Sequence, residues 1–83
     1  IGAGFIPDTL DTSIYDEIIT VSNEEAIATT RQLARESGIF TGISAGANVF
    51  AARKVAKQLG AGKTVVTILC DTGERYLSTG IYD

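Results

Sequence analysis

The sequence predicts an α/β fold, in which short β-branched runs alternate with helical patterns. Residues 17–21 (EIITV) and 64–70 (TVVTILC) are typical of strands. Helical periodicity follows the first run at residues 22–37 and precedes the second at residues 44–59. The second run is almost continuously apolar, as in a strand covered on both faces. We therefore expect a parallel or mixed sheet with flanking helices.

The first helix is predicted to begin at Ser22, after a Gly-rich loop over residues 1–13. Ser22 and Glu25 form a capping-box pattern, in which each side chain bonds the backbone N–H of the other residue. Gly38 is placed to end this helix, because glycine readily adopts the left-handed conformation of a C-cap. Its apolar face is formed by Ala26, Ile27, Leu33 and Ala34.

The second helix is predicted to start at Ser44 or Ala45 and to stop at Gly60. A short extended segment, residues 39–41, leads into it. The small residues in its first half favour close packing against a neighbour; they are Ala45, Gly46, Ala47, Ala51 and Ala52. An apolar stripe continues along it through Ala52, Val55, Ala56 and Leu59.

Composition limits the classes of function. The chain has 83 residues, of which 45% are hydrophobic, so we expect part of its apolar surface to be covered by something else. Because it also starts at Ile1 rather than Met, we interpret it as a fragment of a longer chain. A net charge of −3 with scattered basic residues argues against nucleic-acid binding, and no apolar run is long enough for a membrane span. One cysteine and no histidine exclude an internal disulfide and His-based metal or triad chemistry here, and favour a reducing, cytoplasmic setting.

Ser44 is the leading candidate for a binding residue. It lies between Gly42 and Gly46 at the corner where the second helix begins. Serine is a preferred N-cap, so one interpretation is purely structural. The other is a hydroxyl presented to a ligand at a helix N-terminus, with glycines that allow the backbone to approach closely.

Residues 71–79 (DTGERYLST) follow the second strand, where ligand sites of α/β folds collect. Together with the Ser44 corner they suggest a cofactor pocket. The structural alternative is a loop in which Glu74 and Arg75 make an ion pair and Tyr76 packs. Cys70 is interpreted as an inert thiol. The lysines are expected to be solvated; they are Lys54, Lys57 and Lys63.

Four ordered motifs make a resemblance specific: IGAGFIP at residues 1–7, NEEA at 23–26, GISAGA at 42–47 and GERYLST at 73–79. Over essentially its whole length the chain resembles the C-terminal part of the cysteine synthase (O-acetylserine sulfhydrylase) family of fold-type II pyridoxal-phosphate (PLP) enzymes. The resemblance implies a three-layer sheet with flanking helices. Residues 1–83 would form the C-terminal segment of the large PLP-binding α/β domain.

The resemblance also implies site residues. Ser44 matches the serine that hydrogen-bonds the pyridine nitrogen of PLP, while Gly2, Ala3 and Gly4 match part of a loop bordering the substrate. A neutral hydroxyl donates to an unprotonated nitrogen, and the positive end of the helix dipole disfavours a proton there. The milder electron sink that results suits β-replacement. The Schiff-base lysine lies outside these residues, so the segment holds no catalytic residue and is expected to be inactive alone.

By the same resemblance, the intact protein would make cysteine from O-acetylserine and sulfide as a homodimer. Ala45 stands where a second serine is common, and residues 70–72 (CDT) stand where Pro-Ser-Ser-like residues are frequent. A cysteine synthase B-type or cystathionine β-synthase-like enzyme therefore stays open. So does a regulatory surface that docks the C-terminal tail of serine acetyltransferase, and so does an isolated α/β module with an incidental glycine corner.

Overall fold

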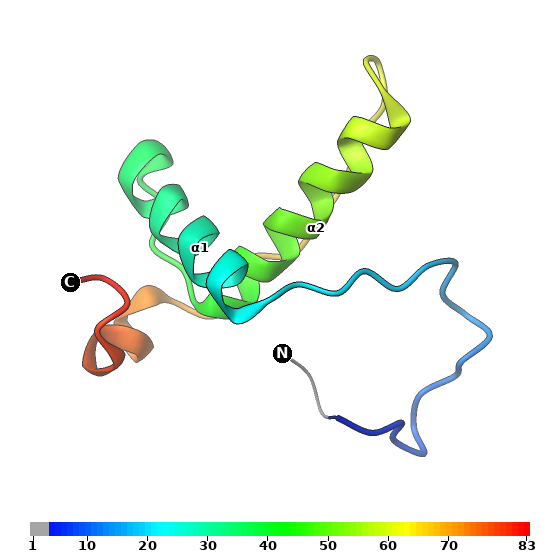
Figure 1. The fold of residues 1–83 in the computed structure, drawn as a ribbon, viewed down its shortest axis with the longest axis horizontal. Helices are drawn as coiled ribbons and strands as arrows, with labels where there is room; N and C mark the ends of the chain where they lie inside the picture. The colour runs from blue at the N-terminus through cyan, green and yellow to red at the C-terminus, as the bar shows by residue number, and fades with distance from the viewer. Residues whose placement is uncertain (1–3) are drawn as a thin grey trace.

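The computed structural model describes residues 4–83, which form two α-helices and one 3-10 helix, with long extended segments before the first α-helix and after the second (Figure 1). They are α1 (Asn23–Ser37), α2 (Ile43–Leu59) and η1 (Gly73–Thr79). The two α-helices form a V that is closed where each of them begins. The radius of gyration is 14.0 Å, whereas a compact domain of this length has about 12 Å. The described chain is therefore open rather than spherical.

Helix α1 is bounded as its local sequence predicts. Ser22 Oγ accepts from the Glu25 N–H at 3.1 Å, and Glu25 Oε1 accepts from the Ser22 N–H at 3.0 Å, so the capping box is confirmed. At the other end Gly38 has φ 66°, and the Ile39 N–H reaches the Leu33 carbonyl at 3.1 Å. The Gly38 N–H reaches the same carbonyl, so a left-handed glycine ends the helix as predicted.

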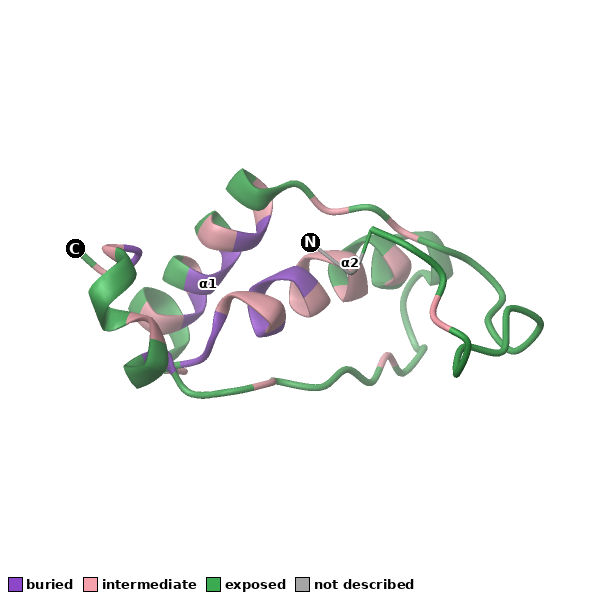
Figure 2. Ribbon diagram, turned by 90° about the horizontal axis from the view of Figure 1, so that it is seen from below, coloured by how far each residue is buried: buried purple, intermediate pink, exposed green. Residues whose placement is uncertain are grey.

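The core of the described residues lies between α1 and α2 (Figure 2). Gly46 of α2 sits so close to α1 that an added Cβ would overlap Thr30 Oγ1 and the Ala26 carbonyl oxygen. The Thr30 hydroxyl remains satisfied, because it donates to the Ala26 carbonyl at 2.7 Å. The small residues at the start of α2 thus allow the close packing that the sequence predicted, and Ala45 and Ala47 are buried there.

The predicted strands do not form in residues 4–83. Residues 17–21 and 64–70 are extended but form no strand ladder, and the β-pairing among the described residues is one isolated antiparallel bridge, Thr41 to Thr72. Val66 is 87% exposed and Ile68 71%. A strand needs a second strand for its backbone hydrogen bonds, and no partner segment lies among the described residues. The expected three-layer sheet is therefore not observed.

Two further expectations need correction. The apolar stripe of α2 is not a buried face, since Ala56 is exposed and Leu59 is 49% exposed. Residues 73–79, interpreted as a loop, form the 3-10 helix η1. Among residues 4–83, no helix has both the length and the apolar character needed to cross a membrane.

Candidate functional site

The start of α2 is closed on one side by the segment that leads into η1. The Gly42 N–H donates to the Cys70 carbonyl at 3.4 Å, and the Gly73 N–H donates to the Phe40 carbonyl at 3.1 Å. The bridge between residues 41 and 72 lies between these two bonds. The two stretches that the sequence assigned to one pocket therefore lie side by side.

Ser44 is not the N-cap of α2, which corrects the structural interpretation of this serine. The N-cap is Gly42, with φ −85° and ψ 175°, and it offers no side-chain capping bond. Ser44 is the second residue of the helix and is half-buried, and its hydroxyl has no hydrogen-bond partner within residues 4–83. The first turn carries no acidic residue. The N–H groups that follow Gly42 in this turn have no partner within the helix, and they carry the partial positive charge of its N-terminus.

Asp71 organises the neighbouring segment. Its carboxylate accepts from Arg75 Nη1 at 2.7 Å through one oxygen and from Tyr76 Oη at 3.1 Å through the other. The predicted ion pair of this loop therefore exists, but the partner of Arg75 is Asp71 rather than Glu74. The hydrogen bond to Asp71 raises the pKa of Tyr76 above its ordinary value, because it favours the protonated phenol.

The Tyr76 ring lies against the N-cap of α2. A Cβ added at Gly42 would be 2.6 Å from Tyr76 Cε2 and 3.1 Å from Asp71 Cβ, so no larger residue fits there without movement. Gly73 is restricted in the same way, since a Cβ would overlap the Phe40 ring. Both glycines are explained by close approach, and φ is not positive at either.

The substrate-loop residues are described only in part. Gly4 is exposed with φ 76°, and an added Cβ would meet no atom within 4 Å. Gly2 and Ala3 lie outside the described residues. The structure of residues 4–83 thus does not bring Gly4 against Ser44.

The other candidates are accounted for structurally. Cys70 is half-buried beside Asn48 of α2, whose Nδ2 lies 3.7 Å from the sulfur and donates to the Ile68 carbonyl at 2.9 Å. The predicted solvation of the lysines is confirmed: Lys54, Lys57 and Lys63 are exposed. No group of three or more potential metal ligands is found in the part of the chain that is described.

Sequence reasoning missed Thr41 and Tyr82. Thr41 is 6% exposed, and its Oγ1 has no partner among residues 4–83. Its carbonyl accepts from the Tyr82 hydroxyl, and the Tyr82 ring packs on Phe40 with centroids 4.7 Å apart. These residues are 41 positions apart, so no local pattern could have paired them.

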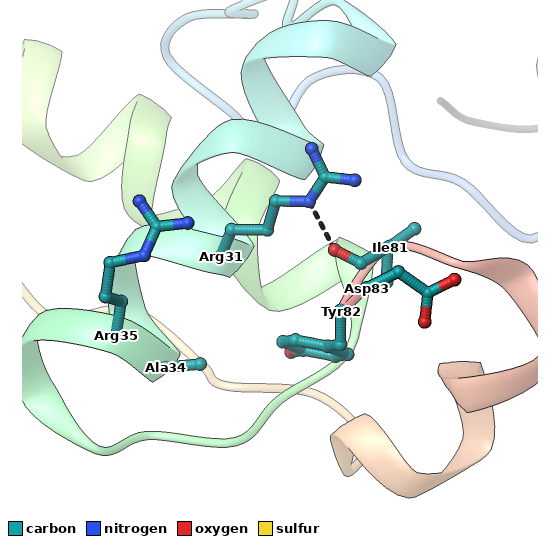
Figure 3. A pocket seen from close by; sticks show the side chains of 6 residues that line it. All are labelled: Arg31, Ala34, Arg35, Ile81, Tyr82 and Asp83. Carbon is teal, nitrogen blue, oxygen red and sulfur yellow. Dashed lines mark hydrogen bonds between the residues drawn. The ribbon is translucent and has the colours of Figure 1, made fainter.

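A separate hollow lies between α1 and the last described residues (Figure 3). It has a volume of about 250 Å³, and the Arg31 Nε donates to the Ile81 carbonyl at its edge. The lining residues are Arg31, Ala34, Arg35, Ile81, Tyr82 and Asp83. None of the predicted site residues lines it.

Comparison with known proteins identifies the class. Residues 1–71 match the family described as pyridoxal-phosphate dependent enzyme. This match spans most of the chain, and the chain belongs to that family. The resemblance drawn from the four motifs is confirmed at this level.

The particular relatives are cysteine synthases. The chain is 58% identical over 82 residues to the cysteine synthase of Staphylococcus aureus (strain Mu50 / ATCC 700699). The alignment covers 99% of this chain and 26% of that protein. The chain thus spans about a quarter of the length of the curated relative it matches.

Solved structures agree with the curated relative. The cysteine synthase of Entamoeba histolytica superposes with a TM-score of 0.92 at 43% identity, covering 99% of this chain and 25% of that one. A structure of O-ureido-L-serine synthase superposes at 0.89 and 44% identity, covering 98% of this chain and 26% of that one. With this coverage, the extended segments follow the path of the corresponding segments in those longer chains.

Proposed function

We propose that this chain is part of a PLP-dependent enzyme that makes L-cysteine from O-acetylserine and sulfide by β-replacement. The 58% identity to a cysteine synthase supports this reaction. The observation that carries the proposed site is the start of α2, where Ser44 is half-buried and its hydroxyl has no hydrogen-bond partner among residues 4–83. In this proposal Ser44 donates a hydrogen bond to the pyridine nitrogen of the cofactor.

The residues present fit such a group. When bound, PLP serves as an electron sink for bonds at the substrate's α-carbon. Ser44 supplies a neutral donor, and the uncapped N-terminus of α2 places partial positive charge beside it. Both features favour an unprotonated ring nitrogen, whereas a carboxylate at the same position would hold a proton there.

We further propose how this segment fits into the longer protein. Residues 17–21 and 64–70 become strands once other parts of the chain pair with them, as the C-terminal part of a three-layer, fold-type II α/β domain. Their exposed apolar side chains and extended paths support this placement. Gly2, Ala3 and Gly4 border the substrate in this arrangement. The Schiff-base lysine lies elsewhere in the protein, so these residues alone are inactive.

The test is Ser44→Asp in the full-length protein loaded with PLP. A carboxylate beside the nitrogen is expected to keep that nitrogen protonated. The rate of cysteine formation should then fall at least tenfold, because one pKa unit corresponds to about a tenfold change in an equilibrium. PLP content, measured by absorbance, should remain stoichiometric. Ser37→Asp makes the same change at an exposed position of α1 and serves as the matched control. A Ser44→Asp protein with parental activity would contradict the role of Ser44.

The choice of sulfide as the nucleophile rests on the curated relative alone. Identity to the solved cysteine synthase (43%) and to O-ureido-L-serine synthase (44%) is almost equal, so a related β-replacing enzyme of cysteine synthase B or cystathionine β-synthase type is the alternative. Steady-state rates with sulfide and with other nucleophiles separate these activities. A sulfide rate below that of another nucleophile would overturn the assignment to cysteine.

We also propose that the intact enzyme is a cytoplasmic homodimer that docks the C-terminal tail of serine acetyltransferase. Both associations follow from the family resemblance. Light scattering measures the dimer. Titration with a peptide ending in isoleucine, followed by cofactor fluorescence, measures docking, and an unchanged signal would argue against it.

A further inference from the structure

Asp71 has a backbone conformation that needs an explanation. Its φ of 59° makes it the one non-glycine residue with a positive φ among residues 4–83. Aspartate visits the left-handed region more readily than most residues, but the conformation persists only where the surroundings determine it. The residues on both sides are held to the start of α2, through the Cys70 carbonyl and the bridge at Thr72. The strained residue is thus fixed beside Gly42.

The carboxylate of Asp71 accepts hydrogen bonds from two side chains, and one of them, Tyr76, also lies against α2. Arg75 is 69% exposed and Asp71 33%, and an exposed ion pair is screened by solvent and contributes little. The bond from Tyr76 Oη is 3.1 Å long and has the same charged acceptor. Tyr76 is also the partner whose ring lies against α2.

Tyr76 therefore has two fixed ends. Asp71 accepts from its hydroxyl, and Gly42 lies against its ring edge at the N-cap of α2. Ser44 follows Gly42 by two residues in the same first turn. The N-cap makes no side-chain capping bond of its own, and the Tyr76 ring packs directly against it.

We infer that Asp71 is a positioning residue: through Tyr76 it holds the first turn of α2 in the orientation in which Ser44 meets the cofactor. The inference rests on the proposed function, because it takes Ser44 to bind PLP. Asp71 itself touches neither cofactor nor substrate in this account. Its effect passes through the orientation of the Tyr76 ring.

Two mild variants of the full-length protein test the inference. Asp71→Asn keeps the shape and the tolerance of left-handed backbone, but it leaves one acceptor oxygen for two donors. Tyr76→Phe keeps the ring on Gly42 and removes the donor. Each is expected to weaken PLP binding about tenfold and to shift the fluorescence emission of the bound cofactor. The double variant should be no weaker than either single one, because both changes break the same bond.

Asp71→Gly separates the effect of backbone strain on PLP binding from the effect of the carboxylate, because glycine adopts a positive φ without strain. It should weaken PLP binding as much as Asp71→Asn does. Glu36→Gln removes an exposed carboxylate on α1 and is the matched control, with affinity and emission unchanged. Lower thermal stability with unchanged affinity and emission in the Asp71 and Tyr76 variants would overturn the inference.

Ser44→Ala, measured alongside, distinguishes this failure from that of the proposed function. If Ser44→Ala changes PLP affinity or emission but the Asp71 and Tyr76 variants do not, the positioning role of Asp71 is wrong and the proposed role of Ser44 stands. No effect of Ser44→Ala on affinity or emission removes the proposed role of Ser44 itself, and the inference with it.

Discussion

The helix pair and the extended segments of this chain are stabilised in different ways. Helix α1 has both ends capped by its own side chains and backbone, and it packs so closely on α2 that glycine is required at position 46. Residues 64–70 instead leave Val66 87% exposed and Ile68 71% exposed. Residues 4–22 likewise expose Phe5 and Ile6.

The difference follows from where each element finds its hydrogen-bond partners. A helix satisfies its backbone within about one turn, so helix-forming signals can act within a short segment. A strand takes its partners from another segment. The apolar character of residues 64–70 thus predicts a neighbouring segment that covers them. Substitutions in each region measure how far its stability depends on such a neighbour.

The largest effect is expected from Val66→Asp in the full-length protein. If residues 64–70 form the proposed buried strand there, an unpaired charge destabilises the fold by about 4 kcal/mol. Urea unfolding measures the change, and Lys63→Asp in the adjoining exposed turn is the control. A loss below about 1 kcal/mol, typical of surface positions, would show that this segment remains exposed in the longer protein.

The next effect is Gly46→Ala. The added methyl overlaps both a side chain and a backbone oxygen of α1, and overpacking of this kind costs about 3 kcal/mol at the upper end of its usual range. Thr30→Ala in the same protein should restore only part of the stability, because the Ala26 carbonyl still obstructs the methyl. Thermal unfolding of the single and double variants tests this. Full rescue would mean that α1 and α2 are not held at backbone contact.

Ser22→Ala should cost about 1 kcal/mol by removing the capping box. The hydrogen bonds from Ser22 lower the pKa of Glu25 below its ordinary value. A carboxyl with a depressed folded-state pKa stabilises the protein above its unfolded pKa, and this contribution is lost as pH falls through the folded value. Because Ser22→Ala keeps the backbone N–H that bonds Glu25 Oε1, the pH-dependent part is measured with Glu25→Ala. The stability gap between the parent and Glu25→Ala, measured by urea unfolding, should narrow as the solution is acidified. A gap that stays constant on acidification to about pH 3, below the unfolded pKa of a glutamate, would contradict the reciprocal bond.

The smallest effect is Lys54→Gln. Lys54 Nζ lies 5.2 Å from the centroid of the Phe50 ring, and an exposed cation–π contact is worth about 0.5 kcal/mol. Lys57→Gln is the comparison on the same helix, without a ring contact among the described residues. The free energies of unfolding of the two variants, measured with a chemical denaturant, should differ by no more than this amount. Equal values would show that the contact contributes no stability.

Local signals predicted the helices well and the site only partly. Ser22, Glu25 and Gly38 act within a few residues of one another, and the end of α1 agrees with them. The end of α2 at Gly60 is also as predicted, but its start moved from Ser44 to a cap at Gly42. The glycines there were expected to let the backbone approach a ligand, whereas the close neighbour of Gly42 is the Tyr76 ring.

The rest depended on distant parts of the chain. The partner of Arg75 was misassigned because the turn at Asp71, with its positive φ, brings that carboxylate back over η1. The buried Thr41 gained its partner Tyr82 from far along the sequence. The sheet could not be decided by local reasoning either, because a strand takes its partner from another segment and these runs form no ladder among residues 4–83.

The distance between Thr41 and Tyr82 has a consequence for biosynthesis. Helices form in about a microsecond, and α1 and α2 are adjacent in sequence, so this pair can assemble as soon as both are translated. At about 5–20 residues per second, the 41 residues from Thr41 to Tyr82 take seconds to emerge. The α1–α2 pair that carries Ser44 can therefore form on the nascent chain before the later segment that closes the start of α2 is made.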